Sequence, residues 1–337
     1  MPEQQPPLSE DLPKYEPRTK LFGEAAERIQ KAEYDSVVAG ILRKTEGSFQ
    51  RIEPAKQLAD KESFGDIDLV YLKDSPYHKS LFEEIFGENL IDYHRNGPVY
   101  STLVRLDDGR KVHVDFISAQ DEEDFERQMI YFSKGHLSSI IGMMAKKLEF
   151  KYGTEGFFKR FKDAKGNWHD VLVSENLKDG MRVLGLNTET YEQVETVDEI
   201  VEFVAASPLF DSEFFEVKNL ARRDRESIRR IATQAYLTNK LATLHRERTI
   251  EDGDALFKQY FPEEYQNYLE KIGEVNGEIE RRATINGNLV METFGLKPGP
   301  PVGAVLRYLK ENHPSTQEIT PELEAEVREK VLSFTDL

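Results

Sequence analysis

The sequence predicts an α+β fold: a mixed sheet with helices, then a small α/β unit, then an all-helical C-terminal region. Apolar and polar residues alternate on both sides of Asp107-Asp108-Gly109, a strong turn signal, which is typical of a β-hairpin. Other segments carry apolar residues at helical spacing. After Ser207-Pro208 the strand signals vanish, so we place a domain boundary there.

These patterns divide the chain into four parts. Residues 1–18 are polar and rich in proline, so we expect a flexible lead. The mixed sheet belongs to residues 19–130, the small α/β unit to 131–207 and the helical region to 208–337. With 337 residues, the chain is long enough for two or three units that each bury a core.

The sheet-forming part carries alternating helix and strand signals. In chain order they are a helix over 22–44, a strand over 66–72, a helix over 77–88 that closes with Gly87, strands over 99–106 and 110–117, and an acid-rich helix over 120–130. The two strands around residues 107–109 form the predicted hairpin.

The rest of the chain is expected to be mainly helical. Before the boundary we expect a helix over 135–150, a hairpin whose turn is 163–167, and helices near 175–183 and 196–205. Beyond it, helices are expected over 212–246, 262–282 and 286–311.

Composition limits the possible chemistry. The chain has no cysteine, which excludes disulfides, thiolate zinc sites and a cysteine nucleophile, and fits an intracellular, cytoplasmic protein. No apolar run approaches the roughly 20 residues that span a bilayer, so no membrane partner is expected. The polar N-terminus does not resemble a signal peptide.

Three acids are spaced so that they can share one face of a sheet. Asp66 and Asp68 are two residues apart in the apolar strand, and Asp115 follows on a second strand. Side chains alternate between faces, so Asp66 and Asp68 emerge together while Ile67 is buried on the other side. Crowded carboxylates favour a hard cation such as Mg²⁺. The alternative is that Asp66 and Asp68 keep an edge strand soluble.

The wider pattern resembles a known family. Gly47-Ser48 with Arg51, then Gly65-Asp66-Ile67-Asp68, then Asp115 is similar to the nucleotidyltransferase superfamily of DNA polymerase β, and in detail to its family X palm. Residues 131–135 (Tyr131-Phe132-Ser133-Lys134-Gly135) resemble the turn that family X places under the nucleotide. The resemblance covers roughly residues 20–207, so 19–130 would be the palm and 131–207 the thumb-like subdomain.

This resemblance implies an enzyme that adds nucleoside monophosphates from a nucleoside triphosphate to the 3′-hydroxyl of a nucleic acid and releases pyrophosphate. It implies two Mg²⁺ ions, or Mn²⁺, held by Asp66, Asp68 and Asp115, with Asp115 near the 3′-oxygen. It also implies nucleotide-binding residues, namely Gly47, Ser48, Arg51 and Gly65 at the phosphates and Tyr131, Phe132 and Ser133 at the sugar and base.

Three positions depart from the family X pattern. About ten residues, including Lys56 and Gln57, lie between Arg51 and Ser63 where the family has a tighter loop. His113 stands where the family usually has arginine, and Lys134 interrupts the nucleotide turn.

A second resemblance lies near the C-terminus. Residues 285–303, which include Phe294-Gly295-Leu296 and Pro298-Gly299-Pro300, resemble a segment of bacterial CCA-adding tRNA nucleotidyltransferases and poly(A) polymerases, with Asn288 in place of the usual Asp. Gly295 and Gly299 are expected to end a helix, and Gly303 to let the next helix pack closely. The alternative is a purely structural turn.

A cluster of cations follows the predicted boundary. Residues 218–248 hold nine Lys and Arg against three Asp and Glu, a local surplus of six in a chain of net charge −17. Lys218, Arg222, Arg225 and Arg229 share one face if residues 212–246 form one helix. We expect this face to bind the phosphates of a nucleic acid, a DNA primer or an RNA 3′-end. The alternative is a solvated helix face.

Several functions are compatible with the sequence. The interpretation as a family X DNA polymerase-like enzyme is supported by the largest number of residues. The interpretation as a CCA-adding or other RNA 3′-end enzyme is supported by the C-terminal segment. A small-molecule or protein nucleotidyltransferase fits the acidic surface. An inactive binding module is the fourth alternative, although such a module would normally have lost one of the three acids. No obligate protein partner is evident.

Overall fold

The computed structural model describes residues 21–22, 25–72, 78–229, 231–313, 316 and 318–334. The lead expected over 1–18 lies outside the described residues. The chain divides into two compact units. The first combines Met1–Arg160 with Leu172–Tyr265, and the second combines Phe161–Val171 with Gln266–Leu337.

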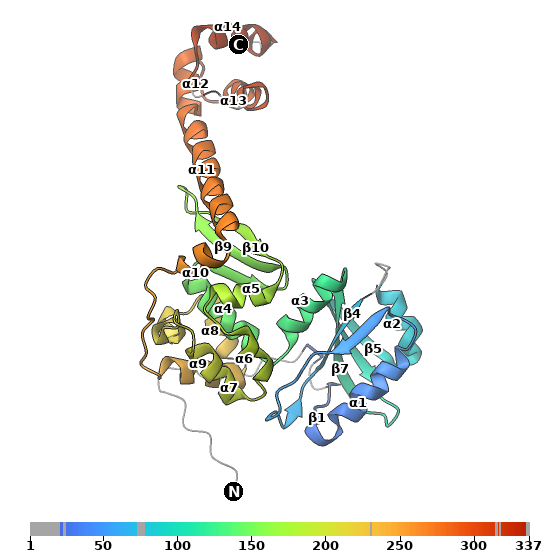
Figure 1. Cartoon of the computed structure of the whole chain (residues 1–337). Coiled ribbons are helices and arrows are strands. Elements are labelled where there is room, and N and C mark those ends of the chain that lie inside the picture. The colour runs from blue at the N-terminus through green and yellow to red at the C-terminus, as the bar shows by residue number, and fades with distance from the viewer. Residues whose placement is uncertain are drawn as a thin grey trace. The chain divides into compact units, whose positions relative to one another are not determined.

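A five-stranded mixed sheet forms the first part of unit 1 (Figure 1). Its strands, in spatial order, are β2 (Arg51–Pro54), β4 (Ile67–Leu72), β7 (Lys111–Ala119), β6 (Val99–Arg105) and β5 (Leu90–Asn96). Strands β4 and β7 are parallel, and the other neighbours are antiparallel. The predicted strands 66–72, 99–106 and 110–117 are therefore confirmed as β4, β6 and β7, and the mixed α and β content is as expected.

Helices cover both faces of this sheet. On one face α1 (Lys31–Lys44) and α2 (His78–Phe86) pack on a core that contains Leu69, Tyr71 and Phe116. On the other face α3 (Glu122–Phe132) buries Phe125 against Val70 and Ile117. Asp121 caps α3 by accepting a hydrogen bond from the Asp124 backbone at 2.8 Å. The helices expected over 77–88 and 120–130 are confirmed.

The expected helix over 22–44 is wrong at its start. The helix begins at Lys31, because Ile29–Gln30 form a short strand, β1, that pairs with β3 (Ser63–Phe64). Gln30 has extended backbone and forms a capping box with Glu33 at the N-terminus of α1. Strands β2 and β5, like β1 and β3, were not predicted from the sequence.

A three-stranded sheet with helices follows in the chain. It consists of β8 (Phe150–Gly153), β9 (Gly156–Lys162) and β10 (Trp168–Ser174), with β9 in the centre. The surrounding helices are α4 (Leu137–Lys147), α5 (Leu177–Val183), α6 (Thr188–Gln193) and α7 (Val197–Ala205). These bounds confirm the expected hairpin and the helices near 135–150, 175–183 and 196–205. Strand β8 and helix α6 were not anticipated.

The single helix expected over 212–246 is wrong. The segment contains two 3₁₀ turns, η3 (Ser212–Phe215) and η4 (Val217–Asn219), then α8 (Arg222–Ile228) and α9 (Ala232–Ala242). Extended backbone at Leu220 and Ala221 separates η4 from α8. Buried Phe215 and Leu220 on either side of η4 show that burial of apolar side chains outweighs helix continuity here.

The compact units do not divide at Ser207-Pro208. Ser207 donates a hydrogen bond to the Leu184 carbonyl at 2.7 Å, and the Thr249 amide donates to the Pro208 carbonyl at 2.7 Å. These bonds, with helix α10 (Ala255–Tyr260), return residues 208–265 to unit 1. No strand follows β10 among the described residues, as predicted.

Unit 2 has its own small core. It contains most of α11 (Pro262–Thr284) and all of α12 (Gly287–Phe294), α13 (Pro300–Asn312), α14 (Pro321–Lys330) and the 3₁₀ turn η5 (Leu332–Phe334). Val290, Val305 and Val327 are fully buried where α12, α13 and α14 meet. Among the described residues, no helix has the length and apolarity to cross a membrane.

The glycine-rich turn between α12 and α13 is only partly as expected. Gly295 ends α12 in the left-handed conformation, at φ 68°, and α13 begins with Pro300. A methyl group at Gly303 would meet no described atom within 4 Å, so the expectation that Gly303 permits close helix packing is wrong.

Candidate active site

The structure brings the three aspartates to one region of the sheet. Asp68 and Asp115 lie directly opposite each other in the parallel pair of β4 and β7, and Asp66 immediately precedes β4. The intervening Ile67 and Val114 are fully buried on the opposite face, as the alternation predicted. Strand β4 has neighbours on both sides, which excludes the alternative that Asp66 and Asp68 keep an edge strand soluble.

The carboxylates interact strongly. Burial raises the pKa of Asp68 well above its ordinary value, and the charges of Asp66 and Asp115 raise it further. Asp115 Oδ1 lies 2.8 Å from His113 Nε2, and both side chains are largely buried. Burial lowers the pKa of His113, but the hydrogen bond and charge of Asp115 outweigh this and raise it overall. The ionised state of Asp68 is thus disfavoured without a nearby cation.

The donor set fits a hard divalent cation in its chemistry. Carboxylate oxygens are the usual ligands of Mg²⁺, and a bound cation relieves the charge repulsion among three neighbouring acids. Among the described residues, however, no three carboxylates or imidazoles converge in the arrangement of ligands to one ion. The bond from His113 holds Asp115 Oδ1, whereas the second carboxylate oxygen of Asp115 makes no hydrogen bond within the described part of the chain.

A loop that the sequence analysis did not assign to the site lies beside the triad. The side chain of Gln57 faces both Asp68 and Tyr34. Lys61 donates a hydrogen bond to Gln57 Oε1 at 3.1 Å and lies near enough to Asp66 and Asp68 for their charges to raise its pKa, against a larger lowering by burial. Gln57 and Lys61 belong to the ten residues that depart from the family pattern, and no sequence signal identifies them as site residues.

Tyr34 contributes a polar atom that lacks a partner. Its side chain is only 7 % exposed, and no described residue meets its hydroxyl with hydrogen-bond geometry, although the Gln57 side chain lies near it. Burial raises its pKa well above the ordinary value of a tyrosine, with further contributions from Asp68 and Asp66. A buried hydroxyl without a partner costs about 1–3 kcal/mol, so a ligand or water that completes its hydrogen bond would be stabilised at this position.

The same loop connects the triad to residues 131–135. The Lys56 amide donates to Ser133 Oγ at 3.0 Å, and the Lys134 amide donates to the Lys56 carbonyl at 2.6 Å. Leu58 lies so close to Gly135 that a methyl group there would approach it to 3.2 Å. Lys134 itself adopts φ 60° and donates to the Val194 carbonyl at 2.6 Å. The structure therefore brings Ser133 to the loop that faces the acids.

Tyr131 and Phe132 lie at the end of α3, just before this turn. Their rings meet edge to face with centroids 5.3 Å apart, and Tyr131 also stacks on Tyr152 at 6.4 Å. Phe132 packs against the core under α3. Burial raises the pKa of Tyr131, while the charge of Arg223 on α8 lowers it, so Arg223 lies near this aromatic pair.

Arg51 does not join the triad in the structure. It lies opposite Leu72, four residues along β4 from Asp68, a separation of about 13 Å along the strand. Its guanidinium contacts Glu53, Glu122 and Glu126 at 2.7–2.8 Å and covers the Phe125 ring at 3.9 Å. The prediction that Arg51 binds phosphates is therefore not supported by its position, because the glutamates of α3 are distant in sequence but contact its guanidinium.

Gly47 and Ser48 occupy the turn between α1 and β2. Gly47 has φ 76°, a left-handed conformation that glycine adopts without strain, and the Ser48 amide donates to the Thr45 carbonyl at 3.0 Å. Gly65 immediately precedes Asp66, so of the four residues assigned to the phosphates it is the one adjacent to the triad.

The four cations assigned to nucleic-acid binding do not share one helix face. Lys218 lies on η4 and pairs with Glu216 at 2.8 Å, whereas Arg222 pairs with Glu226 at 2.9 Å. Arg225 is half-buried and donates to the Leu220 carbonyl at 2.7 Å. Arg229 is exposed at the end of α8. The prediction of an aligned face is wrong, because the segment is not one helix.

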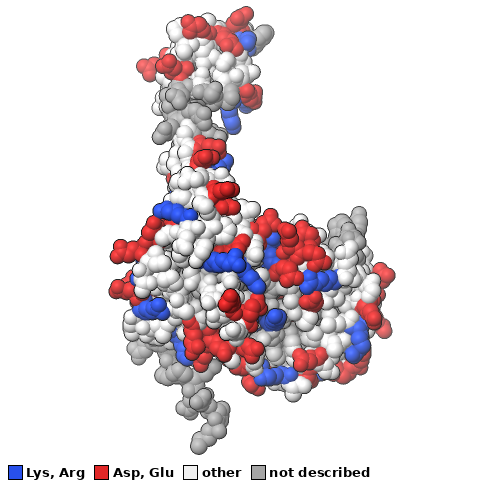
Figure 2. Space-filling view, in the orientation of Figure 1, with Lys and Arg blue, Asp and Glu red and all other residues white. Residues whose placement is uncertain are grey.

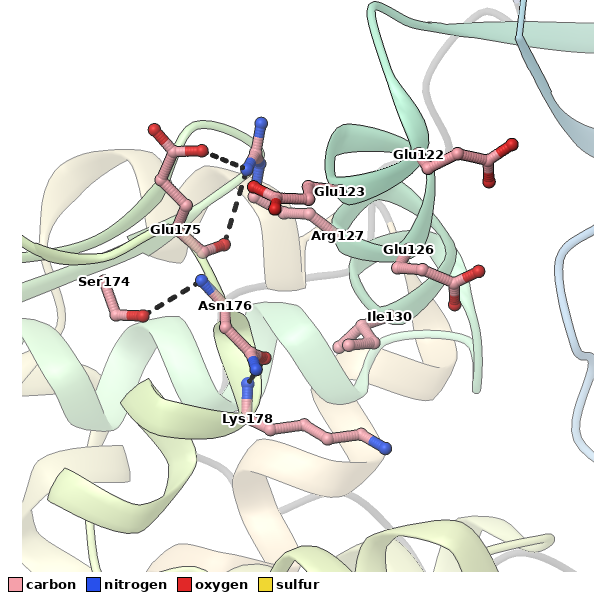
Figure 3. A pocket seen from close by; sticks show the side chains of 9 residues that line it. All are labelled: Glu122, Glu123, Glu126, Arg127, Ile130, Ser174, Glu175, Asn176 and Lys178. Carbon is pink, nitrogen blue, oxygen red and sulfur yellow. Dashed lines mark hydrogen bonds and ion pairs between the residues drawn. The ribbon is translucent and has the colours of Figure 1, made fainter.

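A separate cavity of about 660 Å³ lies between α3 and the connection from β10 to α5. In Figure 3, Arg127 is turned toward Glu175, while Glu122 and Glu126 point away toward the other side of α3. Arg127 pairs with Glu175 at 3.2 Å and with Asp124 at 2.9 Å. None of the three aspartates lines this cavity.

We expect His136 to make stability depend on pH. Burial lowers the pKa of this imidazole to about 4, with a smaller contribution from Lys61. The folded state therefore resists protonation, and stability falls as pH decreases from about 6.5 toward 4, by up to roughly 3 kcal/mol. Urea denaturation of wild type and His136→Gln at pH 7 and pH 4.5 should show the larger loss in wild type. Equal losses in both proteins would contradict this assignment.

Comparison with known proteins finds no protein-family model that matches the chain and no curated protein that is similar to it. The chemistry of the site is therefore inferred from the residues that form it.

Proposed function

We propose that the chain is a metal-dependent nucleotidyltransferase that adds a nucleoside monophosphate to the 3′-hydroxyl of a nucleic acid. The observation that carries the proposal is the pairing of Asp68 with Asp115 on adjacent parallel strands, with Asp66 beside them. Three like charges at a central position of a sheet repel one another unless they bind a cation and its substrate. The resemblance to the family X palm supports the same activity.

In the proposed reaction, the acceptor 3′-oxygen bonds to the α-phosphorus while the bond from that phosphorus to the bridging oxygen breaks. Pyrophosphate leaves with the electron pair, and the hydroxyl proton passes to the Asp115 carboxylate. Asp66, Asp68 and Asp115 would hold Mg²⁺, which supplies charge neutralisation on the phosphates and activation of the 3′-oxygen. His113 would orient the Asp115 carboxylate through its 2.8 Å contact. Tyr131 and Phe132 would shape the pocket of the sugar.

The test is incorporation of labelled nucleotide in the presence of Mg²⁺. Each NTP and dNTP would be offered with gapped DNA, single-stranded RNA and a tRNA that lacks its CCA end. Extension of gapped DNA by dNTPs would assign a DNA polymerase-like enzyme, and addition of CTP and ATP to the tRNA would assign a CCA-adding enzyme. Absence of incorporation with every acceptor would overturn the proposal of a nucleic-acid substrate.

The acceptor would bind near α8, although the face shown in Figure 2 carries many acidic side chains with basic ones between them. Arg222 and Arg229 are exposed, and Arg223 lies near Tyr131. We expect the double variant Arg222→Glu, Arg229→Glu to weaken acceptor binding for all sequences and to flatten its salt dependence, because each phosphate contact adds about 0.7–0.9 to the slope.

Titration of fluorescent single-stranded RNA and DNA at several salt concentrations measures this effect. The matched control is Arg328→Glu on α14, a cation of unit 2 that is half exposed and pairs with Glu324. Unchanged acceptor affinity at low salt in the α8 variant would assign these arginines to a solvated surface.

A further inference from the structure

Two cations lie beside the Gly65-Asp66 turn, and neither forms an ion pair with a described residue. Arg28 donates to Ser63 twice, from Nε to Oγ at 3.0 Å and from Nη2 to the carbonyl at 2.8 Å. Lys61 donates to the neutral Gln57 and lies 4.7 Å from the centroid of the Phe64 ring. Among the described residues, no carboxylate lies within 4 Å of either cation.

The two cations are also close to each other. The charge of Arg28 is near enough to disfavour protonation of Lys61. Arg28 and Lys61 repel each other, and an anion bound beside both of them would relieve this repulsion. Asp66 and Asp68 are near enough to influence the pKa of Lys61 but do not form an ion pair with it. Its ammonium group is therefore available to a ligand.

The absence of a side chain at Gly65 lets the Arg28 guanidinium approach the backbone beside the triad. A methyl group added to Gly65 would lie 3.2 Å from Arg28 Nη1, so the guanidinium lies directly over the glycine. Arg28 Nη1 makes no hydrogen bond within the described residues, and Arg28 is exposed. The adjacent Tyr34 hydroxyl is buried near Gln57 and has no hydrogen-bond geometry with any described residue. Donors without partners thus face the same region as the three acids.

We propose that Arg28 and Lys61 bind the β- and γ-phosphates of the nucleoside triphosphate. This inference rests on the proposed function and replaces Arg51, whose guanidinium is occupied by three glutamates. The arrangement would separate two roles: Asp66, Asp68 and Asp115 would hold Mg²⁺, which would supply charge neutralisation, and Arg28 and Lys61 would neutralise the leaving pyrophosphate. Gln57 and Ser63 are positioning residues that hold the two cations.

The test measures binding and turnover separately. Affinities for a nucleoside triphosphate, for inorganic tripolyphosphate and for the nucleoside alone would be measured by calorimetry with Mg²⁺. We expect Arg28→Met and Lys61→Met each to weaken triphosphate and tripolyphosphate binding by roughly 10- to 100-fold, as is typical of a lost charge-assisted hydrogen bond. Binding of the nucleoside should not change.

Two matched controls make the result specific. Lys56→Met removes an exposed cation of the same loop, whose nearest acid is Glu192 at 3.9 Å, and should leave all affinities unchanged. Arg51→Met should also leave tripolyphosphate affinity unchanged. If Arg51→Met weakens it and Lys61→Met does not, the assignment is overturned in favour of Arg51.

The outcomes also separate this inference from the proposed function. The inference alone would be overturned if the wild-type protein incorporates nucleotide and the variants Arg28→Met and Lys61→Met keep normal triphosphate affinity and incorporation rate. A wild-type protein that binds neither triphosphate nor tripolyphosphate would overturn both. Tripolyphosphate binding that depends on Arg28 and Lys61 in a protein without incorporation would support the anion site and overturn the proposed reaction.

Discussion

Asp68→Asn and Asp115→Asn should each reduce nucleotide incorporation by roughly 1,000-fold or more, while the protein remains folded. Both residues supply carboxylate charge to the proposed cation site, and an amide of the same shape cannot replace that charge. Asp68→Asn should also stabilise the fold slightly at neutral pH, because burial and the charges of Asp66 and Asp115 disfavour the ionised form of Asp68.

Single-turnover incorporation and thermal unfolding measure these two effects. The matched control is Asp107→Asn in the β6–β7 hairpin, an acid that is 85 % exposed and pairs only with Lys44 among the described residues. It should keep wild-type activity. A triad variant that retains more than about a tenth of wild-type activity would remove that residue from the proposed ligand set, since the loss would be below 1.4 kcal/mol.

Asp254→Ala should destabilise unit 1 by about 2–4 kcal/mol. Asp254 Oδ1 lies 2.7 Å from Lys159 Nζ, and the Lys159 side chain is only 3 % exposed. Lys159 also donates to the Leu148 carbonyl at 3.2 Å and lies over the Phe150 ring. Removal of Asp254 leaves a buried ammonium without its closest carboxylate, and a buried charge that loses its partner is strongly unfavourable.

The double variant Lys159→Met, Asp254→Leu tests this cause. Methionine fills a similar volume without a charge, so we expect the double variant to recover at least half of the loss in urea denaturation. Glu251→Ala is the matched control, since Glu251 is an exposed acid of the same segment. Additive losses in the double variant would show that Lys159 and Asp254 do not interact, and that residues 250–260 join unit 1 by other contacts.

The sequence predicts the parts of the fold that depend on local pattern. Alternation of apolar and polar residues places Asp66, Asp68 and Asp115 on strands with their neighbours buried, because a strand has a side-chain period of two. The hairpin at Asp107-Asp108-Gly109 is likewise a local property. Helices α3, α5 and α7 lie where the sequence predicts helices, and the structure shows a capping side chain at the start of each.

The partners of the charged side chains were decided by tertiary structure alone. Arg51 meets Glu122 and Glu126, which are more than 70 residues away in sequence, so its local motif could not exclude it from the phosphates. Lys61 and Arg28 become neighbours because β1 pairs with β3, and a two-residue strand leaves almost no sequence signal. The helix expected over 212–246 is broken because Phe215 and Leu220 gain more from burial than the backbone gains from continuing the helix. Strand alternation and caps are thus determined by neighbouring residues, whereas charge pairing and helix breaks depend on which distant surfaces the fold brings together.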